Sequence, residues 1–199
     1  MTLLRRRIIL SASNNTNESA IRLCIQHVDG TLYTQPQWES RGFLQSDANG
    51  VAVVSKNIAF VIAKNNLGEL SWSLGEGAMS GTATENPMSD FDGKGNTERM
   101  LHLDSGGAIY SCANYVFPNG QRGYLPALGE LSILQNFETT INRLLKLIGG
   151  EGFGSLQYWS SSQASAEKAY FWTGSVMASL GKNYIKYVRP FTTIETVTV

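Results

Sequence analysis

The chain has 199 residues, and its 16 Lys and Arg balance its 16 Asp and Glu, so the formal charge at neutral pH is zero. This balance excludes a nucleic-acid binder that relies on bulk positive charge, and it excludes a polyacidic tail. Charged residues make up only 16% of the chain, whereas it contains 20 Ser, 14 Thr, 14 Asn and 8 Gln. Such a surface suits hydrogen bonds to sugars, to other chains or to water, and zero net charge favours self-association.

The first 20 residues divide into a basic, apolar start and a polar run. Arg5, Arg6 and Arg7 lie among apolar residues, and residues 11–19 are mostly Ser, Asn and Thr. A secretion signal needs an apolar stretch of about 7–15 residues at that point, and a membrane span needs about 18. We expect neither a standard secretion signal nor membrane insertion. Residues 1–20 are predicted to form an anchoring arm and linker, whose arginines either hold an acidic partner or phosphate or stay solvated.

Residues 21–75 show the alternation of apolar and polar residues that is typical of β-strands. Asp29-Gly30 between two such runs predicts a tight hairpin. The expected strands cover residues 21–28, 31–34, 51–55, 58–64 and 69–74. Five short strands predict a small all-β domain over residues 21–75, to which we assign anchoring and oligomerisation.

Residues 76–95 are rich in glycine and predict a loop-rich connection. A short helix is then expected from Asn96 or Thr97, either of which can cap it, to about Leu103. A second helical segment is predicted over residues 108–115, and the strongest helical spacing covers residues 128–148 and ends at Gly149-Gly150.

The last 50 residues return to strand character. Strands are expected over residues 156–160, 169–173 and 184–191, which are aromatic and β-branched segments between Ser-rich or Gly-rich turns. Helices in the middle of the chain with strands on both sides predict an α+β fold.

Four motifs in the second half occur in a familiar order. They are GYLPALGEL at residues 123–131, IGG at 148–150, YWSSS at 158–162 and YVRPF at 187–191. This order resembles the C-type-lectin-like domains of the bacterial "major paralogous domain" type, which are related to the C-terminal domain of collagen-like adhesins. Ala127 and Ser162 depart from the serine and threonine of the family pattern. The resemblance covers about residues 90–191 and implies a C-type-lectin-like domain over residues 96–199.

Segments of the first half, such as DGTLY at residues 29–33 and DGKGNT at 92–97, are similar to proteins of phages of gut bacteria and their prophages. In those proteins the lectin-like domain follows a small β unit. The resemblance implies a non-enzymatic virion protein, a head or tail fibre or decoration, at the virion surface. Its expected partners are further copies of itself as a dimer or trimer, other virion proteins and host-surface glycans. The alternative is a bacterial adhesin or glycan-binding module at the cell surface.

Aromatic residues of the predicted strands are candidates for glycan contact, because sugar rings pack on exposed aromatic faces. The candidates are Tyr158, Trp159, Trp172 and Tyr184, although an aromatic cluster on strands is also the usual composition of a core. Arg189 is expected to pair internally with a carboxylate such as Glu130, as a structural ion pair. Ser160, Ser161 and Ser162 are expected to bond loop backbone or, alternatively, a sugar.

Catalytic and metal-binding patterns are weak in this sequence. Asp90, Asp92 and Asn96 resemble the start of a calcium loop, but Leu101 occupies the position where an acidic residue would complete the site. The two histidines, His27 and His102, lie in no nucleophile or metal motif, and the Gly-x-Gly pairs lack the setting of a dinucleotide site. We therefore expect no catalytic residue, no metal and no cofactor.

The two cysteines, Cys24 and Cys112, match no zinc pattern. They are expected to be small buried residues, and the sequence leaves open whether they pair.

Overall fold

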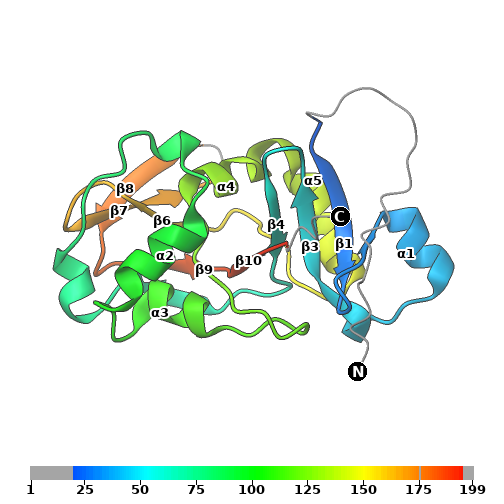
Figure 1. The fold of residues 1–199 in the computed structure, drawn as a ribbon. Helices are drawn as coiled ribbons and strands as arrows, with labels where there is room; N and C mark the ends of the chain where they lie inside the picture. Colours follow the sequence, from blue (N-terminus) through cyan, green and yellow to red (C-terminus); the bar gives the residue numbers. More distant parts are fainter. Residues whose placement is uncertain (1–19, 175, 195–199) are drawn as a thin grey trace.

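The computed structural model describes residues 20–174 and 176–194, and it places two five-stranded sheets toward opposite ends of the molecule (Figure 1). The first sheet has the strand order β10-β4-β3-β1-β2, and the second has the order β5-β9-β6-β7-β8. The strands are β1 (Arg22–His27), β2 (Leu32–Tyr33), β3 (Ala48–Val54), β4 (Ala59–Ile62), β5 (Gly68–Ser71), β6 (Tyr158–Gln163), β7 (Lys168–Trp172), β8 (Met177–Gly181), β9 (Ile185–Val188) and β10 (Phe191–Thr193). The α-helices are α1 (Gln35–Arg41), α2 (Gly93–Leu101), α3 (Gly107–Asn114), α4 (Leu128–Ser132) and α5 (Leu134–Leu147). This confirms the predicted α+β class.

The five strands expected in residues 21–75 all form, but the segment is not all-β. Helix α1 follows β2, because Thr34 caps it, Gln37 bonds back to the Thr34 N–H at 2.9 Å, and Pro36 lies in the first turn. Its Trp38 is buried in the core. The prediction of an all-β unit was wrong because the helix is too short to show a clear period.

The chain crosses from the first sheet to the second and later returns. Strand β5 pairs with β9 in the second sheet, whereas β10 returns to pair with β4 in the first. The two crossing connections run side by side, since Ala63 N donates to Pro190 O at 3.0 Å and Leu67 N donates to Val188 O at 2.8 Å. Each sheet therefore combines strands from both halves of the chain. The predicted domain boundaries at residues 75 and 96 stay a prediction.

Each sheet is covered by helices, and we name the two ends accordingly. The base is the first sheet with α1 and α5, where α5 packs on β1 and β3. The head is the second sheet with α2 and α3, which form one apolar cluster with Trp72, Trp159 and Phe171. A second cluster runs from the base through α5 to Tyr158 and Trp172 of the head. The central strands β6 and β7 of the second sheet are thus packed on both faces.

The second half departs from expectation in four places. Helix α2 starts at Gly93 with Asp92 as its cap, and the predicted helix over residues 128–148 is divided into α4 and α5 at Ile133. The predicted strand over residues 184–191 divides into β9 and β10 because Pro190 has no N–H to donate to a ladder. Strand β8 was missed, since Met, Ala, Ser and Leu are not typical strand residues. Within the described residues, no helix is long and apolar enough to cross a membrane.

Candidate functional site

Three of the four aromatic residues proposed for glycan contact belong to the core. Tyr158 and Trp159 are adjacent on β6, so their side chains point to opposite faces of a sheet that is covered on both. Trp172, opposite Tyr158 on β7, is buried as well. The prediction of ligand contact was wrong for these three residues. Tyr184 is 55% exposed, and its role in binding stays a prediction.

The predicted ion pair between Arg189 and Glu130 does not form. Both side chains are buried, but each has other partners. Glu130 Oε2 accepts from the Ala127 N–H at 2.7 Å, where it caps α4, and Glu130 Oε1 accepts from the Tyr124 hydroxyl at 2.8 Å. The capping role has a local signal in the sequence. Glu130 of GYLPALGEL is the third residue of α4, where a glutamate typically bonds back to the N–H of the cap residue.

Arg189 lies where the two crossing connections meet. Its Nε donates to Asn66 Oδ1 at 2.8 Å, and its Nη1 donates to the Glu151 carbonyl at 2.7 Å. The guanidinium also lies 4.3 Å from the centre of the Phe153 ring. Burial lowers the pKa of Arg189 to about 10, so the group stays charged at neutral pH. Arg189 therefore holds together the β4–β5 connection, the β9–β10 connection and the segment after α5.

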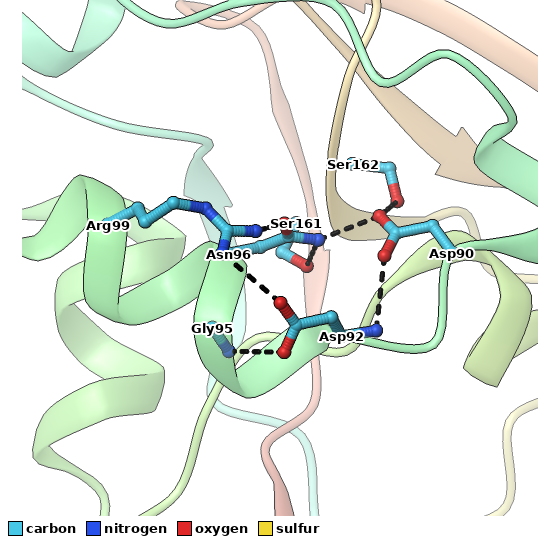
Figure 2. A network of polar contacts seen from close by, with 7 residues as sticks. All are labelled: Asp90, Asp92, Gly95, Asn96, Arg99, Ser161 and Ser162. Carbon is cyan, nitrogen blue, oxygen red and sulfur yellow. Dashed lines mark hydrogen bonds and ion pairs between the residues drawn. The ribbon is translucent and has the colours of Figure 1, made fainter.

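Asp90, Asp92 and Asn96, which resemble the start of a calcium loop, lie close together at the start of α2 (Figure 2). Asp90 Oδ2 accepts from Asn96 Nδ2 at 2.7 Å and from the Ser162 hydroxyl at 2.6 Å, while Asp90 Oδ1 accepts from the Asp92 N–H at 3.1 Å. Asn96 Nδ2 also donates to Ser161 Oγ at 3.2 Å. The network thus ties the 90–96 segment to strand β6.

The same network shows what this site can do chemically. Asp92 caps the Gly95 N–H at 3.0 Å and pairs with Arg99 at 3.2 Å. The carboxylate oxygens therefore already accept from protein donors, and no group of three or more His, Cys, Asp or Glu able to hold a metal occurs in the described part of the chain. Of the β6 serines, Ser161 and Ser162 join this network, and Ser162 also accepts from the Leu128 N–H at 3.0 Å, whereas Ser160 donates to the Tyr170 carbonyl at 2.9 Å.

A groove lies between base and head, on the side of α2. Its larger hollow measures about 620 Å³ and is lined by Lys94, Thr97, Glu98, Asn114, Arg122 and Thr193, among others. A smaller hollow of about 280 Å³ continues past Lys94 and Tyr124 to Phe91, which is 42% exposed, and to Glu130. The walls therefore combine hydroxyls, amides, opposite charges and one exposed ring.

Glu130 is the most perturbed acid at this groove. It is 4% exposed, and burial raises its pKa from 4.5 to about 8, reinforced by the negative charges of Asp90 and Asp92. The hydrogen bonds from Ala127 and Tyr124 act in the opposite direction, since they favour the ionised form. Glu130 is therefore largely protonated at neutral pH.

Lys182 is a buried cation that sequence reasoning missed. Its Nζ donates to the Gly77 carbonyl at 3.2 Å, the Gln163 side-chain oxygen at 2.7 Å and the Ala166 carbonyl at 2.6 Å, and it lies 4.5 Å from the Trp72 ring centre. Burial lowers its pKa to about 8. All these partners come from distant segments, so no local pattern in the sequence could have identified it.

The histidines, the cysteines and the N-terminal arginines are the remaining candidate residues. His27 Nδ1 lies 3.1 Å from Asp29 on the β1–β2 turn, and His102 is exposed at the end of α2. Cys24 and Cys112 are free and buried in different clusters, and burial raises the pKa of both thiols. Arg5, Arg6 and Arg7 lie outside the described residues.

Comparisons with known proteins leave the family open. No protein-family model matches the chain, and no curated protein matches it. Among solved structures, a fimbrial protein from Bacteroides ovatus ATCC 8483 aligns with 68% of this chain at 18% sequence identity and a TM-score of 0.46. The alignment spans about a third (35%) of the length of that protein's chain.

Proposed function

We propose that this chain is a non-enzymatic structural subunit of a phage particle, a fibre or decoration protein of the head or tail. One observation carries the proposal. The first and last strands of the described chain, β1 and β10, both belong to the base, whereas the head lies at the opposite end of the molecule (Figure 1). A chain that enters and leaves at one end can be held there while it presents the other end.

The connection between base and head supports a role in which the chain carries mechanical force. The chain crosses between the sheets in two adjacent connections that bond to each other, and Arg189 joins both of them to the segment after α5. A single flexible linker would let the head move independently. Two bonded crossings and a shared core instead transmit a pull on the head to the base.

The proposed setting is the virion surface. The base, together with the N-terminal arm that carries Arg5, Arg6 and Arg7, would contact other virion proteins. The head would present its hydroxyl-rich and amide-rich surface to neighbouring subunits of a homo-oligomer or to host glycans.

The test is the presence of the chain in particles. Particles released by a producing culture are purified through two density gradients, and an antibody against the head is used with gold labelling and electron microscopy. Regular labelling of intact particles is expected. Absence of the chain from such particles, with purified protein that stays monomeric at micromolar concentration and does not bind them, would overturn the proposal.

A second candidate function, a glycan-binding adhesin, is favoured by the groove. Its volume lies within the range of small-ligand sites, and its walls offer hydroxyls, amides and the exposed ring of Phe91. A glycan array tests it with Phe91→Ala, and Tyr110→Ala serves as the matched control because Tyr110 is an exposed aromatic that does not line the groove. Binding by the wild type that only Phe91→Ala removes would support an adhesin, and no binding on the array would count against it.

A further inference from the structure

The edge of the head sheet at β8 is open. Strand β8 pairs with β7 over five residue pairs without a bulge, and in the described part of the chain no strand pairs with its other side. Met177 on this edge is 40% exposed, and Ser179 is also exposed. An open edge of this kind presents a row of N–H and C=O groups to any strand that can reach it.

Backbone alternation identifies which groups face outward. Thr173 N donates to Val176 O at 3.2 Å, and Lys182 N donates to Glu167 O at 3.0 Å. In an antiparallel ladder, every second residue pair exchanges such bonds, so the backbone groups of Ala178 and Leu180 face β7. The N–H and C=O groups of Met177 and Ser179 therefore point away from the sheet.

The edge lacks the features that usually prevent strand pairing. Natural edge strands carry lysine, proline or a bulge, whereas β8 consists of Met177-Ala178-Ser179-Leu180-Gly181. The next residue, Lys182, is charged, but its side chain is buried and places no charge on the edge. The edge is thus neutral, in a chain whose net charge is zero.

The apolar core of the head also reaches this edge. Ala178 and Leu180 are only partly buried, and they pack against the cluster that contains Trp159 and Phe171. Val176, directly before β8, is exposed. A strand added beside β8 would therefore cover apolar side chains as well as satisfy backbone groups.

We infer that β8 is a self-association edge, where it pairs antiparallel with β8 of a second copy about a two-fold axis at Ser179. This inference rests on the proposed structural function, because it names the surface through which the head meets a neighbouring subunit. Ser179 would exchange both backbone hydrogen bonds with Ser179 of the second copy. Met177 would face Gly181, beside which the Asn183 side chain and the Tyr184 ring lie, and Ala178 would face Leu180.

A second copy fits this edge because the residue pattern is complementary to itself. Reversed about Ser179, the strand places a large side chain opposite a small one on each face, and it brings no like charges together. Such a contact is isologous and closes at two copies, joining two five-stranded sheets into one.

The test is a charge swap at the two-fold axis, with the full chain. Sedimentation velocity of the wild type from about 5 to 200 µM should show a dimer. It should form within this concentration range, as expected for a weak but specific interface. Ser179→Lys and Ser179→Glu each place like charges face to face and should weaken the dimer at least about tenfold. An equimolar mixture of the two should restore a dimer that contains one copy of each. Ser179→Thr, which keeps the residue neutral and suited to a strand, should leave dimerisation unchanged.

Three results would overturn the inference: a wild type that is monomeric throughout, charged variants that dimerise like the wild type, or a mixture that does not recover. Because Ser179 is exposed, unchanged thermal unfolding of each variant checks that the fold is intact. Particle labelling separates this inference from the proposed function. A monomer that is found in particles contradicts only the β8 pairing, and a β8 dimer that is absent from particles contradicts only the structural role.

Discussion

The buried acid Glu130 makes the stability of this protein depend on pH in an unusual direction. Its folded pKa of about 8 lies above the 4.5 of an ordinary glutamate, so between these values the folded state binds a proton that the unfolded state has lost. Stability from this group is therefore complete below pH 4.5 and is lost as the pH rises to 8. Most paired carboxylates show the opposite dependence.

The variant Glu130→Gln isolates this contribution. The side-chain amide is neutral at every pH, its oxygen can accept from the Ala127 N–H, and its N–H can donate to the Tyr124 hydroxyl. At ~1.4 kcal/mol for each tenfold change, the difference between 4.5 and about 8 corresponds to at most about 5 kcal/mol. Relative to the variant, we expect the wild type to lose at least about 2 kcal/mol of unfolding free energy between pH 5 and pH 8.5, because water entry offsets part of the burial cost.

Urea unfolding at pH 5, 7 and 8.5 measures the effect as a difference between the two pH profiles, which removes titrations common to both proteins. Glu98→Gln is the matched control, because Glu98 is an exposed acid of α2 that pairs with Lys94 at 4.0 Å. Its profile should run parallel to that of the wild type. Parallel profiles for Glu130→Gln as well would refute the reasoning that Glu130 is protonated in the fold.

Four further predictions concern stability. Arg189→Lys should cost about 2–4 kcal/mol in urea unfolding, because one ammonium cannot span Asn66 and the two carbonyls that the guanidinium reaches, and a loss below 1 kcal/mol would contradict its clamping role. Trp172→Ala should lower the free energy of unfolding by about 3–5 kcal/mol because Trp172 is buried, whereas Tyr184→Ala should change it by no more than about 0.5 kcal/mol because Tyr184 is exposed. Similar losses for the two variants would contradict this difference in burial. Asp90→Asn should cost about 1–3 kcal/mol, since an amide cannot accept from all three donors. Calcium should leave the wild-type Tm unchanged within about 1 °C. A larger rise would indicate that Asp90, Asp92 and Asn96 bind calcium.

Local chemistry explains which elements could be predicted from the sequence. The hairpin at Asp29-Gly30, the strands of residues 48–62 and the helix ending at Gly149-Gly150 depend on turn residues and periods that neighbouring residues supply. Helix α1 and strand β8 were not predicted, because α1 is short and β8 lacks β-branched residues. Local capping at Thr34 and the burial of Trp38 stabilise α1, whereas pairing with β7 stabilises β8.

The candidate site shows a different limit. The sequence correctly marked Asp90, Asp92 and Asn96 as neighbours, because they lie within seven residues of one another. Their bonds to Ser161, which accepts from Asn96, and to Ser162, which donates to Asp90, depend on strand β6, which lies more than 60 residues away in the chain. Which distant side chains bond to these residues could therefore not be inferred from the sequence.

By itself, the sequence determined that this is a neutral, hydroxyl-rich chain of strands, helices and strands, with short-range turns and caps in predictable places. Only the tertiary structure decided that β5 and β10 cross between the sheets, that the aromatic residues of β6 and β7 are core, and that Arg189 and Glu130 have separate partners. The physical reason is that turns and periods arise from contacts within a few residues. Strand exchange, burial on both faces of a sheet and the choice of partner for a buried charge depend on which distant segments meet.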